Sequence, residues 1–250
     1  MLISYSHNFL FVHVPKTAGT SIVRCLRPYA HDSSGFLVNR MLEQFGIHVN
    51  LMPGPHQWRR FRPHHSAATI RRHLPRRVYD QMFKFAFVRN PWDWFVSYYH
   101  FHLQCTQHHR HEHVRRLGSF AEFVRWQAAR QRRSQVEFVT DRRGRLLVDF
   151  LGRYETLRDD FQTVCRQVGL DCELPWHNRS ERCNYRSYYD DDTAELVANL
   201  CRADVDAFGY TFDGVESREQ TPITLPFLRA CASQVGAINC GRVAARTPAL

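Results

Sequence analysis

The sequence predicts an α/β domain whose sheet is mainly parallel. Two apolar runs of strand length, at residues 8–14 and 83–88, are each followed by a segment with the helical spacing of apolar residues. Strand-like and helical segments continue to alternate along the chain, without an internal repeat. Since parallel strands are joined by crossover connections, usually helices, this alternation is typical of a parallel sheet covered by helices.

The first half of the chain contains the elements that predict this sheet. Short apolar runs indicate buried strands, and apolar residues three or four apart indicate helices. Pro75 separates two short helical segments, because proline cannot continue a helix. In chain order these rules predict a strand at 8–14, a helix at 20–26, a candidate strand at 46–52, helices at 66–74 and 76–83, and a strand at 83–88.

The helix that follows the second strong strand has a complete start signal. Asn90 can cap it, Pro91 suits its first position, and Asp93 stands in its acidic first turn. We therefore expect a helix from residue 91 to about residue 104.

The second half follows the same rules. Ser119 caps one helix and Gly169 stops another. In order, we expect a helix at 119–131, two strands around a DRRG turn at 136–152, helices at 156–168 and 189–202, and a core-closing segment at 204–212. Periodicity is weak after about residue 221, which predicts one domain at 1–220 and an irregular tail at 221–250.

Charge and cysteine content limit the classes of binding partner and the cellular compartment that we expect for this protein. The net charge of +10 comes from 32 arginines and only two lysines, which suits a partner with phosphate, sulfate or carboxylate groups. A nucleic-acid partner and a merely solvated basic surface both agree with charge alone. The eight cysteines are scattered without a CxxC pair, which argues against a zinc site and a disulfide framework. With no leader-like segment and no long apolar run, we expect a cytoplasmic protein without a membrane span.

One of the two lysines, Lys16, lies in the turn PKTAGTS between the first strand and its helix. The start of a helix exposes backbone N–H groups and the positive end of the helix dipole, so it attracts phosphate-like anions. Lysine adds a mobile charge, and Gly19 lets an anion approach the backbone. Further hydroxyl donors come from Thr17, Thr20 and Ser21. The turn is a candidate anion site, and an ordinary strand-to-helix turn rich in small residues is the alternative.

The turn does not fit a nucleoside triphosphatase. That loop requires GxxxxGKS or GxxxxGKT, with lysine directly before the hydroxyl that holds magnesium, whereas here the lysine comes first. The second strand, FKFAFV, is followed by Arg89 rather than by an acidic metal ligand. We therefore expect an anionic group to be bound without Mg²⁺.

Two segments together resemble a known family. PKTAGTS after one strand and FVRNPWDWFVSYY after another are similar to the nucleotide-binding motifs of sulfotransferases that use 3′-phosphoadenosine 5′-phosphosulfate (PAPS). The resemblance is to the carbohydrate group, which includes heparan sulfate 2-O- and chondroitin 4-O-sulfotransferases and many bacterial relatives. It extends to DFLGRYETL and NRSERCNYRSYY and covers roughly residues 8–212.

The resemblance implies a three-layer α/β sandwich with a P-loop-NTPase-like sulfotransferase fold. It implies a bacterial enzyme that transfers the sulfuryl group of PAPS, by in-line displacement without a metal, to a hydroxyl group. A glycan is the expected acceptor, another hydroxyl-bearing molecule is possible, and no nucleic-acid partner is expected.

The resemblance also assigns roles to residues. The first motif surrounds the 5′-phosphosulfate with Lys16, Thr17, Ala18, Gly19, Thr20 and Ser21. In the second motif Arg89 and Ser97 hold the 3′-phosphate, and a loop that closes over the nucleotide adds Ser180 and Arg182.

Sulfuryl transfer needs a base for the acceptor hydroxyl and a cation for the departing oxygen. Lys16 is the expected cation. Relatives place a histidine in the segment before the second motif, which makes His65 the positional match for the base and His64 its direct competitor. Imidazole titrates near neutrality and suits this role.

Other interpretations stay open or are discounted. A metal-dependent P-loop kinase and a basic anion- or nucleic-acid-binding protein without chemistry are the alternatives. The run HHRHEHVRR at 108–116 is interpreted as a solvated loop or an acceptor-binding basic patch rather than a metal site, because it lacks the usual ligand spacing. The aromatic residues of the second motif are expected to pack in the core.

Overall fold

The computed structural model describes residues 1–30, 41–42, 44–45, 50–51, 60–130, 134–174 and 184–215. Ser180 and Arg182, most of the candidate strand at 46–52 and the expected tail at 221–250 lie outside these residues.

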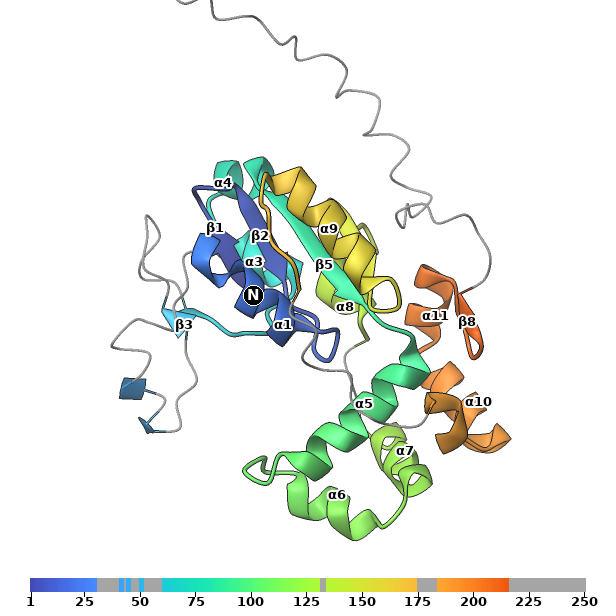
Figure 1. The fold of residues 1–250 in the computed structure, drawn as a ribbon. Coiled ribbons are helices and arrows are strands. Elements are labelled where there is room, and N and C mark those ends of the chain that lie inside the picture. Colours follow the sequence, from blue (N-terminus) through green and yellow to red (C-terminus); the bar gives the residue numbers. More distant parts are fainter. Residues whose placement is uncertain are drawn as a thin grey trace, which may run out of the picture.

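A four-stranded sheet forms the centre of the fold (Figure 1). Its order is β1 (Leu2–Ser4), β2 (Phe9–Val12), β5 (Phe83–Val88) and β6 (Phe150–Arg153). The pairs β2–β5 and β5–β6 are parallel, and β1 is antiparallel to β2. The prediction of an α/β fold with a mainly parallel sheet is therefore confirmed, and β1 is an additional edge strand that the sequence analysis did not identify.

Alternation along the central strands separates two apolar cores. Phe9, Phe11, Phe85 and Phe87 face one side, where they pack with α1 (Gly19–Leu26) and α9 (Leu157–Val168). The intervening residues face the other side, where the covering helices include α3 (Ala67–His73), α4 (Arg76–Gln81) and α8 (Val136–Val139). Because side chains point alternately to opposite faces of a strand, the continuous apolar runs of β2 and β5 are explained by burial on both sides.

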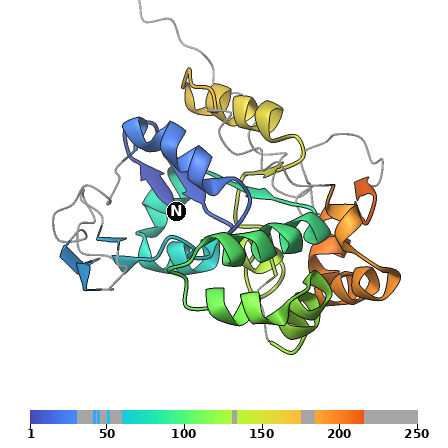
Figure 2. The same cartoon turned by 60° about the horizontal axis from the view of Figure 1, so that its bottom comes forward.

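Helix α5 (Pro91–Gln104) connects this sheet to a group of helices (Figures 1 and 2). It starts as predicted, with the Asn90 side chain accepting from the Trp92 N–H and with Pro91 in its first turn. The helices α6 (His111–Leu117) and α7 (Phe120–Ala128) pack on α5, and α10 (Asp191–Leu200) contacts both α5 and α7.

The remaining described elements are short. They are the strands β3 (Asn50–Leu51), β4 (Arg60–Phe61), β7 (Tyr210–Thr211) and β8 (Gly214–Val215), the helix α11 (Arg202–Phe208), and the 3₁₀ turns η1 (Arg27–Tyr29) and η3 (Tyr185–Tyr188). In the part of the chain that the structure describes, no helix is long and apolar enough to cross a membrane.

Of the two strands predicted at 136–152, the structure corrects the first, whereas residues 150–152 at the end of the second belong to β6. The first half forms the helix α8 instead, and only one antiparallel bridge, Thr140 to Leu146, flanks the DRRG turn. The cause is distant in sequence: the buried carboxylate of Asp204 accepts the N–H groups of Gln135 at 3.0 Å and Val136 at 2.8 Å. A carboxylate at this position stabilises the start of a helix.

Several boundaries also differ. The helix expected at 119–131 ends at Ala128, the one at 76–83 ends at Gln81 before β5, and the one at 189–202 covers Asp191–Leu200. The interpretation of 108–116 as a loop is wrong for its second half, which belongs to α6.

Candidate functional site

The turn that carries Lys16 has an unusual backbone. Lys16 and Ala18 both adopt left-handed conformations, with φ angles of 65° and 61°. The carbonyl oxygen of Ala18 accepts the first hydrogen bonds of α1, from the N–H groups of Ser21 and Ile22 at 3.0 and 3.1 Å. The N–H group of Gly19 precedes these bonds and has no partner within the helix. With the helix dipole, it gives this end of α1 the positive potential that attracts anions.

The hydroxyl groups of the turn have different surroundings. The Thr17 hydroxyl is buried and donates to the carbonyl oxygen of Val14 at 2.9 Å. Thr20 is exposed at the start of α1, and Ser21 is nearly buried. The Thr17 side chain therefore fixes the turn, whereas the exposed Thr20 side chain is accessible to a ligand.

A close contact with the ring of His13 requires glycine at position 19, and the sequence alone did not predict this contact. The ring of His13 lies so close to Gly19 that a Cβ atom at position 19 would stand 1.8 Å from His13 Nε2. Glycine therefore makes room for this ring, in addition to any approach by an anion. The only sequence signal for His13 was one polar residue within the apolar run FLFVHV.

His13 in turn holds one of the two candidate bases. The rings of His13 and His64 are 4.4 Å apart, and His64 Nδ1 lies 3.1 Å from the carbonyl oxygen of His13. Burial lowers the pKa of His64, and it lowers the pKa of His13 well below its ordinary value. His65 has another environment: its Nδ1 lies 3.4 Å from the backbone N–H of Arg62, and its ring stacks on His73. The structure therefore brings His64 to His13, whose ring lies against Gly19 of the turn, and it gives His65 contacts with Arg62 and His73.

The Lys16 ammonium lies over an aromatic ring. Its Nζ atom is 4.5 Å from the ring centroid of Phe101 on α5. Burial, followed by the charge of Arg89, lowers the pKa of Lys16 to about 8, and Cys105 acts in the opposite direction. Among the described residues no carboxylate lies within ion-pair distance of Lys16 Nζ. The positive charge therefore has no acidic partner in the part of the protein that is described.

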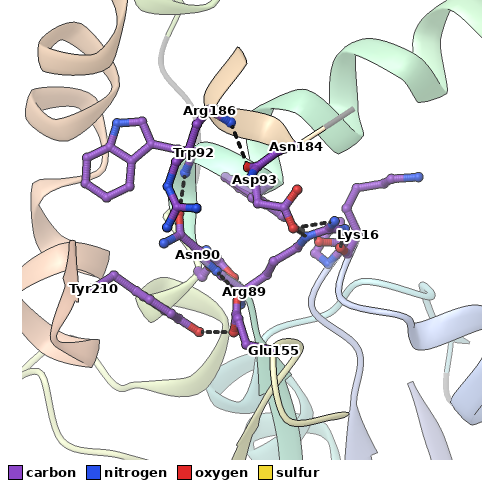
Figure 3. A network of polar contacts seen from close by, with 12 residues as sticks. Lys16, Arg89, Asn90, Trp92, Asp93, Glu155, Asn184, Arg186 and Tyr210 are labelled. Carbon is purple, nitrogen blue, oxygen red and sulfur yellow. Dashed lines mark hydrogen bonds and ion pairs between the residues drawn. The ribbon is translucent and has the colours of Figure 1, made fainter. Parts of the chain in front are cut away.

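The guanidinium of Arg89 connects the two motifs (Figure 3). Its Nε and Nη2 lie 2.7 and 2.6 Å from Asp93 Oδ2, and its Nη1 donates to the carbonyl oxygen of Lys16 at 3.1 Å. The ring of Tyr154 lies 3.8 Å from the guanidinium carbon. Arg89 is only 3% exposed, so this cation supports the opening turn from within the protein.

Two side chains that are distant along the chain, the buried Gln135 and the more exposed Glu155, fix the backbone at the end of β5. The Gln135 amide accepts from the Arg89 N–H at 2.9 Å and donates to the Arg89 carbonyl oxygen at 2.8 Å. The Glu155 carboxylate accepts from the Asn90 N–H at 2.6 Å and from the Tyr210 hydroxyl at 2.9 Å (Figure 3). Burial raises the pKa of Glu155 above its ordinary value. No local pattern predicts these contacts, because each partner is distant along the chain.

One face of α5 lies against the turn. Asp93, Ser97 and Phe101 are spaced four residues apart and therefore share a side of the helix. Asp93 contacts Arg89 and Phe101 contacts Lys16, so the half-buried Ser97 lies between the two cations along this face. The two motifs identified in the sequence thus meet in one site.

Additional polar groups border this site. The Asn184 side chain caps η3, and Arg186 pairs with Asp213 through Nε at 3.1 Å. Figure 3 shows Asn184 and Arg186 beside the first turn of α5. Within the described residues, no group of three or more histidine, cysteine or acidic side chains could hold a metal ion.

Comparison with known proteins gives two findings. A family model described as "Sulfotransferase family" matches residues 1–211. An uncharacterized protein of Archaeoglobus fulgidus is 29% identical to this chain over 119 residues, which are 47% of this chain and 93% of that protein.

Proposed function

Because this chain belongs to the sulfotransferase family, we propose that it transfers the sulfuryl group of PAPS to a hydroxyl group, with a carbohydrate as the expected acceptor. The observation that supports this best is the meeting of two cations at the starts of two helices. Arg89 donates to the backbone of Lys16, whose own ammonium has no carboxylate partner among the described residues. We also propose the three-layer P-loop-like form of the fold, which the helices on both faces of the sheet support.

The donor would be held at its two charged ends. We assign the 5′-phosphosulfate to the Lys16 ammonium and to the donors of the turn, namely Thr17, Ala18, Gly19, Thr20 and Ser21. We assign the 3′-phosphate to Arg89 and Ser97. A guanidinium carries five N–H donors, so the contacts of Arg89 with Asp93 and the Lys16 backbone leave donors for a phosphate.

The transfer step requires three groups in this site. The acceptor oxygen attacks sulfur, its proton passes to a histidine, and the bond from sulfur to the bridging oxygen breaks. The electron pair of that bond stays on the bridging oxygen, where the Lys16 ammonium stabilises the charge. Adenosine 3′,5′-bisphosphate and the sulfated acceptor are the products.

We assign the base to His64 because of its hydrogen bond. Only an N–H can donate to the His13 carbonyl oxygen, so the neutral ring carries its proton on Nδ1 and has a free electron pair on Nε2. The lowered pKa of His64 keeps the ring neutral at physiological pH. In His65, by contrast, Nδ1 accepts the Arg62 N–H, which places the proton on Nε2.

Calorimetry tests the donor assignment. Adenosine 3′,5′-bisphosphate should bind equally well with and without Mg²⁺, and ATP should bind much more weakly. A preference for ATP with Mg²⁺ would support the kinase alternative instead. Transfer from labelled PAPS to glycans, lipids and phenols then identifies the acceptor, and tight binding with no transfer to any of them would support a binding protein.

A matched pair of variants tests the base. His64→Ala should lower the transfer rate by about 10²–10⁴-fold, the usual contribution of a general base, with nucleotide affinity retained. His65→Ala should keep most of the activity. The reverse result, with His65→Ala inactive and His64→Ala active, would discard the assignment to His64.

A further inference from the structure

The core between the sheet and the helices α1 and α9 contains a cluster of three thiols, which we call the thiol triad: Cys25, Cys165 and Cys172. Cys25 lies in the last turn of α1, Cys165 lies in α9, and Cys172 lies in the segment that follows it. Their positions along the chain, without a CxxC pair, gave no sign of this cluster, which forms only in the fold. All three are free thiols.

Cys172 occupies the middle of the thiol triad. Its Sγ lies 3.3 Å from Cys165 Sγ, and its thiol also shares a hydrogen bond with the thiol of Cys25. Cys25 is held in place by donating to the carbonyl oxygen of Glu173 at 3.2 Å. One sulfur atom is therefore in contact with two others that come from different helices.

The backbone around Cys172 is fixed, so this contact does not depend on a freely moving loop. Gly169 ends α9 in a left-handed conformation, and the Leu170 N–H donates to the carbonyl oxygen of Cys165 at 2.9 Å. The Gln162 amide donates to the carbonyl oxygen of Cys172 at 3.3 Å. A disulfide needs its sulfur atoms about 2.05 Å apart, so the two sulfurs would have to approach by little more than one ångström.

We propose that the thiol triad is an oxidation site, in which Cys172 forms a disulfide with Cys165 in the presence of a peroxide, and in which Cys25 can exchange into that bond. Cys25 and Cys172 are both half-buried, whereas Cys165 is buried, and Cys172 is the half-buried member that contacts both other thiols, so we place the first oxidation there. The site is separate from the Lys16 turn, and the proposal does not depend on the sulfotransferase reaction.

The steps balance with peroxide as the oxidant. The Cys172 sulfur attacks one peroxide oxygen, which gives a sulfenic acid and one water. The Cys165 sulfur then attacks the Cys172 sulfur and releases the second water, so that two thiols and one hydrogen peroxide become one disulfide and two waters. In the exchange, Cys25 attacks the Cys172 sulfur and Cys165 leaves as a thiol, without any change in oxidation state.

The environments of Cys25 and Cys165 predict that oxidation is slow and that the disulfide partners are selected by their proximity to Cys172. Burial and the hydrogen bond to Cys172 raise the pKa of the Cys25 thiol to about 12, and burial also raises the pKa of Cys165. Both groups are therefore protonated at neutral pH. Because the thiolate is the nucleophile, proximity to Cys172 rather than intrinsic reactivity selects the partners.

Peptide mapping of the full-length protein tests the proposal. The reduced protein is treated with hydrogen peroxide, free thiols are blocked with iodoacetamide, and the disulfides are identified by mass spectrometry without reduction. We expect a Cys165–Cys172 disulfide in the unmodified sequence. Its absence, or a bond that joins Cys172 only to a cysteine outside the thiol triad, would overturn the proposal, and this result needs no variant to fold.

Three variants then separate the roles within the thiol triad. Cys25→Ser should keep the Cys165–Cys172 bond, Cys165→Ser should form Cys25–Cys172 instead, and Cys172→Ser should form neither. Cys105→Ser is the matched control, because this free and half-buried cysteine stands outside the thiol triad, and the variant should form the same Cys165–Cys172 disulfide as the unmodified protein. A Cys25–Cys165 bond in folded Cys172→Ser would contradict the central role of Cys172.

Discussion

The two lysines of this chain stand at opposite ends of neighbouring parallel strands, and their surroundings differ. Lys84 lies at the beginning of β5, and its ammonium is 2.9 Å from Asp149 Oδ2. It also donates to the carbonyl oxygens of Met82 at 2.6 Å and Tyr79 at 3.3 Å. Lys16 follows the end of β2, lies over Phe101, and has another cation, Arg89, as its charged neighbour.

The difference predicts a structural role for Lys84 and a functional role for Lys16. The charge of Lys84 is satisfied inside the protein by a carboxylate and two backbone oxygens. The charge of Lys16 is partly buried without an acidic partner among the described residues, which costs folding free energy unless an anion binds. A site that stores unsatisfied positive charge is selective for anionic ligands, because the ligand supplies what the protein lacks.

The largest difference between the two lysines is expected in catalysis, where Lys16 and not Lys84 should matter. Lys16→Met should lower the rate of sulfuryl transfer by about 10²–10³-fold, the usual effect of removing one group that stabilises transition-state charge. Its melting temperature should be equal to or above that of the unmodified protein at pH 7, because an uncompensated charge is removed. Transfer assays and thermal unfolding measure the two quantities. A strong loss of stability would mean that Lys16 is structural after all.

Lys84→Met should show the opposite behaviour. It removes the ammonium that donates to two carbonyl oxygens and pairs with Asp149, whose Oδ2 keeps the backbone N–H of residue 84 at 2.7 Å. The variant should lower the free energy of unfolding by about 2 kcal/mol. Asp149 is half-exposed, which keeps the loss below that of a fully buried pair. Urea unfolding measures the change, and activity per folded molecule should stay close to normal. A loss of transfer activity in the folded Lys84→Met variant would contradict the assignment of a purely structural role to Lys84.

The protonation of Lys16 provides a milder test. Its folded-state pKa is lowered to about 8, so the free protein loses this ammonium as the pH rises through 8. An anion bound there favours the protonated form and raises that pKa. The affinity for adenosine 3′,5′-bisphosphate should therefore fall by up to about tenfold per pH unit above pH 8 and should be accompanied by proton uptake. Calorimetry in buffers of different ionisation enthalpy detects this uptake, which Lys16→Met should abolish.

The smallest expected effect concerns the support of Arg89. Gln135→Leu removes the amide that bonds both backbone groups of Arg89, and it should weaken nucleotide binding by about 1 kcal/mol, or about fivefold. The loss should be specific for the 3′-phosphate, so adenosine 5′-phosphate should bind as before. Equal weakening of both nucleotides would indicate general structural damage instead.

Local signals made much of this site predictable. The start of α5 was predictable from three residues within four consecutive positions, Asn90, Pro91 and Asp93. The strand β5 was predictable because burial of both of its faces makes its sequence a continuous apolar run. The turn with Lys16 was also predictable, because its lysine, glycine and hydroxyl residues are adjacent in the chain. The family model covers both motifs.

Contacts between distant residues account for what the sequence did not predict. Residues 136–139 form a helix because Asp204 caps it, and no pattern within VEFV contains that information. The choice between His64 and His65 likewise depends on His13, which stands 51 residues before His64. Because His64 and His65 are adjacent, they share nearly the same neighbouring sequence, and only the fold gives them different contacts.

Because the ring of His13 lies against Gly19, a substitution at one of these two positions constrains which residues are tolerated at the other. A library that randomises position 19 alone would return glycine, because any side chain must displace the ring. A library that randomises both positions can exchange a small residue at 13 for a larger one at 19. Among homologous sequences the two positions should therefore covary, and engineering of the anion turn should treat them as one choice.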